Sequence, residues 1–143
     1  MHSRSVPILA FALAAFLTTA SSAYAQTIKF QAKLDAAQEV PTNDSKGKGT
    51  ADLMYDTTSK NLTWTITFDG LTGPATAAHF HGPAEPGKTA GVALLIGQKP
   101  TSPVKGSATL TDAQAADLMA GRWYVNVHTE ANKPGEIRGQ VTK

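Results

Sequence analysis

The sequence predicts an all-β domain, an antiparallel Greek-key β-sandwich with one short helix. Apolar and polar residues alternate with period two along most of residues 26–143, and Gly, Pro, Asn and Asp separate the alternating segments. Only one segment is rich in helix-forming residues. Many short strands with a single helix favour a sandwich over a fold that alternates strands and helices.

The segments with strand character follow one another with short turns between them. The expected strands cover residues 27–35, 49–56, 61–69, 75–81, 90–96, 104–110, 122–128 and 136–141. The second and third should form a hairpin, because the turn-like residues 57–60 join two alternating segments. Residues 90–96 are apolar throughout, so we expect a buried strand there.

The expected helix covers residues 111–120. Thr111 can cap its start, the following alanines and leucine favour helix, and Gly121 can end it. In the strand 122–128, Trp123, Val125 and Val127 alternate onto one face, which we assign to the core.

The first 25 residues have the features of a cleaved signal peptide. Arg4 precedes an apolar run over residues 6–17, and Ala-Tyr-Ala at 23–25 fits a cleavage site. The run is shorter than the roughly 20 residues that a membrane-spanning helix needs, and no later run is longer. We therefore expect export to a periplasm, no membrane span, and one mature domain over residues 26–143.

Composition excludes several classes of function. Removal of the signal peptide leaves 12 Lys and Arg against 11 Asp and Glu, a near-neutral balance that does not indicate nucleic-acid binding. The chain has no Cys, so disulfides, thiolate catalysis and blue-copper sites are excluded. No serine lies in a Gly-x-Ser-x-Gly motif and no glycine-rich phosphate loop is present, so no catalytic residues are assigned.

Three histidines remain in the mature domain, and their spacing predicts a metal site. His79 and His81 flank Phe80 in the strand 75–81, so both imidazoles should lie on one face with Phe80 on the other. His128, near the end of a later strand, can complete a group of three ligands. Neutral imidazole binds copper and zinc well, and we favour copper first and zinc second.

Polar residues near His128 are further candidates. Asn126 shares a face with His128 and Glu130 follows closely, so either can be a fourth ligand or a hydrogen-bond partner of a ligand. An alternative is that Asn126 bonds a neighbouring loop, while Glu130, Glu136 and Arg138 form ordinary surface ion pairs.

Several motifs together resemble the chordin-type domain, often called CHRD. They are AQEVP at 37–41, LTGP at 71–74, AAHFHGPA at 77–84, the segment 110–121, YVNVHT at 124–129, and the segment 132–140 with PGEIRGQ. Animal chordin carries such domains within an extracellular antagonist of growth factors, while bacterial members are often small exported proteins. The resemblance implies an exported single-domain protein of the second kind.

A weaker likeness is to copper,zinc superoxide dismutase, an antiparallel sandwich with a His-x-His pair and a later histidine as copper ligands. By that likeness His79, His81 and His128 would bind copper and Arg138 would guide an anion. The chain lacks that family's bridging histidine, its cluster of zinc ligands and its cysteine pair.

Three functions follow from these patterns. The first is a non-enzymatic copper-binding protein that buffers, delivers or sequesters the ion. The second is an interaction or structural module, in which the histidines only hydrogen-bond loops and the partner is another exported protein. The third is a copper-dependent redox enzyme of the dismutase kind, which needs an open coordination position. Unpaired edge strands also allow a homodimer.

Overall fold

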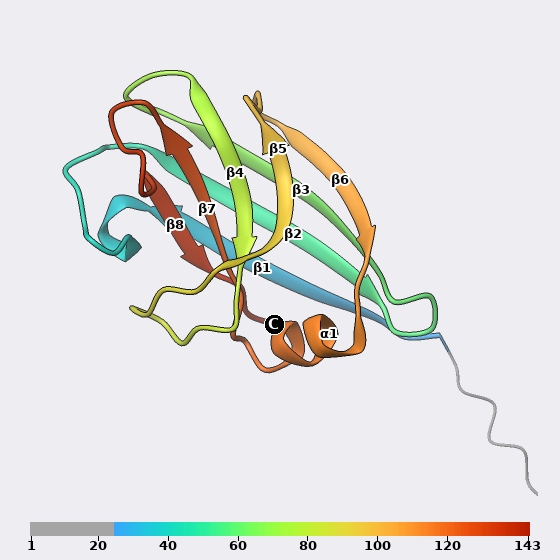
Figure 1. Cartoon of the computed structure of the whole chain (residues 1–143). Helices are drawn as coiled ribbons and strands as arrows, with labels where there is room; N and C mark the ends of the chain where they lie inside the picture. The colour runs from blue at the N-terminus through green and yellow to red at the C-terminus, as the bar shows by residue number, and fades with distance from the viewer. Residues whose placement is uncertain (1–24) are drawn as a thin grey trace, which may run out of the picture.

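The computed structural model describes residues 25–143, which form eight strands and one α-helix (Figure 1). The strands are β1 (Thr27–Asp35), β2 (Lys48–Asp56), β3 (Asn61–Asp69), β4 (Ala75–His81), β5 (Val92–Gln98), β6 (Val104–Thr109), β7 (Tyr124–Thr129) and β8 (Ile137–Gln140). A short 3-10 helix, η1 (Ala36–Gln38), follows β1, and α1 (Asp112–Met119) follows β6. The predicted signal peptide, residues 1–25, lies outside the described residues except for Ala25.

All eight strands belong to one antiparallel sheet in the order β5-β4-β7-β8-β1-β2-β3-β6. Its two halves meet between β8 and β1, where the register pair of Asp35 with Arg138 is supplemented by a single bridge between Gln31 and Thr142. The sheet curls so far that its ends, β5 and β6, lie side by side and nearly close a barrel (Figure 1). The all-β class and the antiparallel pairing are confirmed, whereas the predicted two-sheet sandwich is not.

The core fills the inside of this curled sheet. Trp64 of β3 meets Phe80 of β4 edge to face with 5.3 Å between ring centroids, and Phe80 also packs against Trp123. Since β3 and β4 belong to different halves of the sheet, these aromatic contacts join the halves. Trp123, Val125 and Val127 are at most 1% exposed, which confirms their assignment to the core.

The expectation of a buried strand at residues 90–96 is wrong in part. β5 is the edge strand next to β4, and Val92 and Leu95 are 57% and 48% exposed. Ala93, Leu94 and Ile96 are partly buried against the core. An apolar run therefore marks a strand whose inner side chains reach the core, while its outer ones face solvent.

The predicted helix is confirmed and closes one end of the barrel (Figure 1). The hydroxyl of Thr111 accepts a hydrogen bond from the Gln114 N–H, and the Gln114 side chain accepts one from the Thr111 N–H. This capping box satisfies donors that a helix start leaves unpaired. Leu118 is fully buried and anchors the helix to the core. Across residues 25–143 no helix combines the length and apolar character that crossing a bilayer requires.

Candidate metal centre

The pairing of β4 with β7 brings the three predicted histidines together on the outer face of the sheet. His79 lies opposite Asn126, and His128 lies opposite Ala77 in the same ladder. His79 and His128 are therefore diagonal neighbours, which in a sheet lie within reach of long side chains. Ala78 and Phe80, between and beside the histidines, are fully buried on the inner face.

The imidazole nitrogens converge to distances that suit a shared metal ion. One ligand atom from each of His79, His81 and His128 lies within 4.8 Å of the others, and all three side chains are half-buried. The Nδ1 atom of His79 lies 3.0 Å from the Nε2 atom of His128. Two nitrogens that far apart, each about 2.05 Å from one metal, would subtend an angle of about 95° at it. The donor set therefore fits a transition-metal ion.

A backbone carbonyl fixes the tautomer of His128. The carbonyl oxygen of Lys133 can only accept, so the His128 Nδ1–H donates to it at 2.8 Å. This bond leaves a lone pair on Nε2, which accepts from the His79 Nδ1–H and can bind a metal once that proton has moved. A ring N–H donated to a carbonyl is common around metal-ligating histidines. Glu130 forms an exposed ion pair with Lys133 and makes no hydrogen bond to a histidine in the part of the chain described. Glu130 does not belong to the group of converging ligand atoms, which consists of His79, His81 and His128 within the described residues.

His81 is held more tightly than the other two. Its Nδ1 atom donates to the carbonyl of Ala90 at 3.0 Å, and its ring stacks on Tyr124 with 4.8 Å between centroids and 4° between planes. Its Nε2 atom lies 3.0 Å from Oδ1 of Asn126. With Nδ1 donating to Ala90, the neutral ring has no proton left for Oδ1 of Asn126, so this second contact is a hydrogen bond only in the imidazolium form. A metal bound at this Nε2 requires the imidazole and the Asn126 amide to separate.

Burial lowers the pKa of His79 and of His81, which favours their neutral forms. The pKa of His79 is lowered by burial and by the nearby positive charges that His128 and His81 would carry. The pKa of His81 is lowered by burial as well, against the opposing effect of its hydrogen bonds to Ala90 and Asn126. Metal ions bind the neutral form, so both shifts favour binding near neutral pH.

Asn126 connects the histidines to a buried carboxyl group that the sequence reasoning missed. Its Nδ2 donates to the Pro134 carbonyl at 3.3 Å and to Oε1 of Glu39 at 3.4 Å, which fixes the orientation of its amide. Glu39 is 4% exposed, and burial raises its pKa to about 7 although Asn126 and Arg138 oppose the shift. The only sequence signal for Glu39 was its place in the AQEVP motif.

Arg138 lies one contact further from the ligands. Its guanidinium carbon lies 3.5 Å from the ring centroid of Tyr124, and Nη2 donates to the Lys88 carbonyl at 2.7 Å. Arg138 thus reaches His81 through Tyr124, the ring on which His81 stacks, and also lies opposite Asn126 in the pairing of β7 with β8.

Glu136 and Arg138 are 0% and 2% exposed, so the alternative that they form surface ion pairs is wrong. Glu136 instead accepts hydrogen bonds from Ser45, Thr72 and Thr129. Burial alone would raise its pKa, but these bonds outweigh burial and lower it to about 2. Glu136 ties three segments together beside His128, which explains the position of the loop that follows β7.

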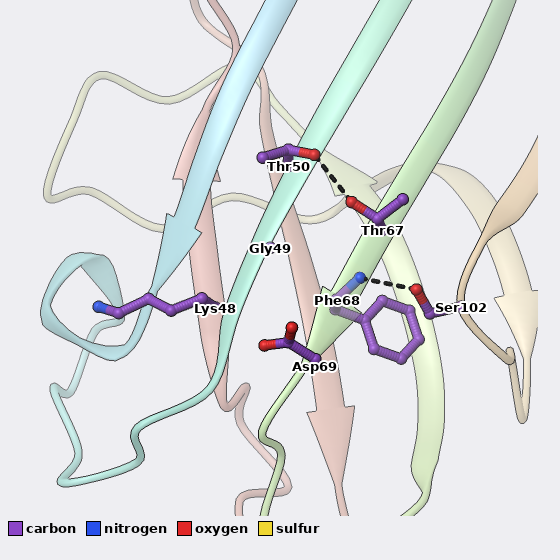
Figure 2. A pocket seen from close by; sticks show the side chains of 7 residues that line it. All are labelled: Lys48, Gly49, Thr50, Thr67, Phe68, Asp69 and Ser102. Carbon is purple, nitrogen blue, oxygen red and sulfur yellow. Dashed lines mark hydrogen bonds between the residues drawn. The ribbon is translucent and has the colours of Figure 1, made fainter.

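Another surface hollow lies apart from the histidines (Figure 2). It is lined by Lys48, Gly49, Thr50, Thr67, Phe68, Asp69 and Ser102. The hydroxyls of Thr50 and Thr67 bond each other at 2.8 Å, and the Phe68 N–H donates to Ser102 Oγ at 2.9 Å. Much of its polar lining is therefore paired within the protein, and the histidine cluster is the better candidate for chemistry.

The comparison with known families supports the resemblance drawn from the motifs. The model of the CHRD domain matches residues 30–141, a span that includes all three histidines, Glu39 and Arg138. No curated protein and no solved structure matches the chain. Since the family model covers well over half of the sequence, the chain belongs to the CHRD domain family.

Proposed function

We propose that this CHRD domain is an exported metal-binding protein that holds one copper ion with His79, His81 and His128. Buffering, delivery or sequestration of the ion is the role that such a site supports. The observation that carries the proposal is the 3.0 Å separation of His79 Nδ1 and His128 Nε2 beside a third imidazole. Export rests on the signal-peptide pattern of residues 1–25.

Copper is favoured over zinc by the chemistry of the ligands. All three ligands are imidazoles, and among divalent first-row metals the affinity of nitrogen ligands peaks at Cu(II). A structural zinc site would normally add a fourth protein ligand. Within residues 25–143 the only cluster of His, Cys, Asp or Glu that suits a metal is this trio.

Copper titration of the mature protein tests this proposal. The parent should bind one Cu(II) per chain, and the double variant His79→Ala/His128→Ala should lose that binding. Glu130→Gln is the matched control, because Glu130 is exposed near His128 and forms its ion pair with Lys133. A double variant that binds copper as tightly as the parent would refute the assignment.

A second candidate is an interaction module in which the histidines are structural. It is favoured by the hydrogen bonds that already engage them, from His79 to His128 and from His81 to Ala90. The exposed Val92 and Leu95 lie opposite His81 and His79 on β5, so a partner could cover both. This candidate predicts no increase of the melting temperature with stoichiometric Cu(II), whereas the copper proposal predicts an increase.

A further inference from the structure

A second cavity lies beside the candidate metal centre, between the segment after β1 and the loop that joins β4 to β5. Its volume is about 340 Å³. Glu39 and Arg138 line it, together with the apolar side chains of Val40 and Pro86. It contains none of the three histidines, so it is a separate site.

Arg138 enters this cavity as a buried cation with few partners. The residue is 2% exposed, yet among residues 25–143 its guanidinium donates a single hydrogen bond, to the Lys88 carbonyl. No carboxylate of the described chain lies within 4.0 Å of it. A guanidinium carries five N–H donors, and burying a cation without an anionic partner is costly. The contact with the Tyr124 ring offsets only part of that cost.

Glu39 does not supply the missing anion. It lines the same cavity and is 4% exposed, but it forms no ion pair with Arg138 and instead accepts from Asn126. Because burial raises its pKa to about 7, much of this carboxyl group is uncharged at neutral pH. A protonated Glu39 does not compensate the charge of Arg138.

We propose that this cavity binds a small organic carboxylate with an apolar stem, whose carboxylate group pairs with the guanidinium of Arg138. The planar fork of arginine matches the two oxygens of a carboxylate and distinguishes it from a spherical anion. Val40 and Pro86 supply apolar surface for a short hydrocarbon stem. The proposal does not depend on copper, because no histidine lines the cavity.

Butyrate is the probe that tests this proposal, with butyramide as its neutral isostere. Calorimetric and NMR titrations of the metal-free protein at constant sodium concentration should give saturable butyrate binding with a Kd of about 1 mM, which lies within the affinity ceiling for a ligand of six heavy atoms. Butyramide should bind at least about tenfold more weakly, because it lacks the charge. Absence of saturation with butyrate up to about 50 times that expected Kd, or equal binding of butyramide, would overturn the proposal.

Variants locate the binding. Arg138→Gln should weaken the binding of butyrate at least about tenfold. Its control, Arg122→Gln, changes an arginine that pairs with Asp117 outside the cavity and should bind as the parent does. Val40 is 40% exposed at the cavity wall, so both Val40→Asp and Val40→Asn should fold. Val40→Asp should weaken butyrate binding about tenfold by charge repulsion, while Val40→Asn should leave butyrate binding unchanged. Butyrate binding that is equal in Val40→Asp and Val40→Asn would contradict the assignment even if Arg138→Gln fails to fold.

Discussion

Nδ1 of His79 lies 3.0 Å from Nε2 of His128, although the two residues are 49 positions apart in the sequence. The register of β4 and β7 produces this distance, because it places His79 opposite Asn126 and leaves His128 on the diagonal. The carbonyl of Lys133 then holds the Nδ1 proton of His128, so the nitrogen that faces His79 carries a lone pair. Sheet register and one loop carbonyl together define the candidate centre.

The Glu136 network should make the fold sensitive to acid. The pKa of Glu136 falls from 4.5 to about 2 in the folded state, so its ionised form stabilises the protein above the unfolded value. That stability should be lost as the pH falls from about 4.5 to about 2. Urea unfolding at pH 6, 4 and 3 measures the free energy of unfolding of each protein relative to its own value at pH 6. This free energy should fall more in the parent than in Glu136→Gln. Equal losses would contradict the role of Glu136.

Glu39 should act in the opposite direction. Its folded pKa of about 7 exceeds its ordinary value of 4.5, so the folded state binds the proton more tightly. Its contribution is fully present below pH 4.5 and is lost as the pH rises through 7. Glu39→Gln should therefore gain stability relative to the parent between pH 5 and pH 8, measured by urea unfolding. A stability gain of Glu39→Gln that does not increase with pH would argue against the raised pKa of Glu39.

Gly135 should not tolerate a side chain. Its φ is +142°, and a Cβ atom there would collide with Oε1 of Glu39 and lie 2.5 Å from Nδ2 of Asn126. We expect Gly135→Ala to destabilise the protein by about 1–3 kcal/mol. Gly73→Ala is the control, since a Cβ atom at Gly73 meets nothing within 4 Å. Chemical denaturation of both variants measures the difference, and equal stabilities would contradict the close approach at Gly135.

Phe80 should matter for stability and not for metal binding. It lies between the two histidines of β4, is fully buried, and packs against Trp64 and Trp123. Phe80→Ala should cost about 3–5 kcal/mol of unfolding free energy. The less severe Phe80→Leu should remain folded and keep one copper per chain. Loss of copper binding in a folded Phe80→Leu protein would contradict the placement of Phe80 on the opposite face of β4 from His79 and His81.

Period-two alternation was enough to predict that Phe80 lies on the opposite face of β4 from His79 and His81, and that Val127 lies on the opposite face of β7 from His128. The same rule predicted the burial of Trp123, Val125 and Val127, because it depends only on strand geometry. The convergence of His128 with His79 and His81 also requires the pairing of β4 with β7, which alternation does not specify. The capping residue Thr111 and Gly121 likewise identified the helix from local chemistry.

The remaining features depend on contacts between segments far apart in the chain. Glu39 and Arg138 are 99 positions apart, and no local pattern reveals that both are buried around one cavity. The burial of Glu136 also depends on distant partners, Ser45 and Thr72. Whether eight strands form two sheets or one curled sheet depends on the narrow junction of β1 with β8, which alternation does not specify.

Electron paramagnetic resonance of the mature protein with one equivalent of Cu(II) tests the central claim most directly. The account predicts a single copper species with hyperfine couplings to imidazole nitrogens, which disappears in His79→Ala/His128→Ala and persists in Glu130→Gln. A spectrum of loosely bound copper without such couplings, or the same spectrum in the double variant, would contradict the assignment of His79, His81 and His128 as a copper site.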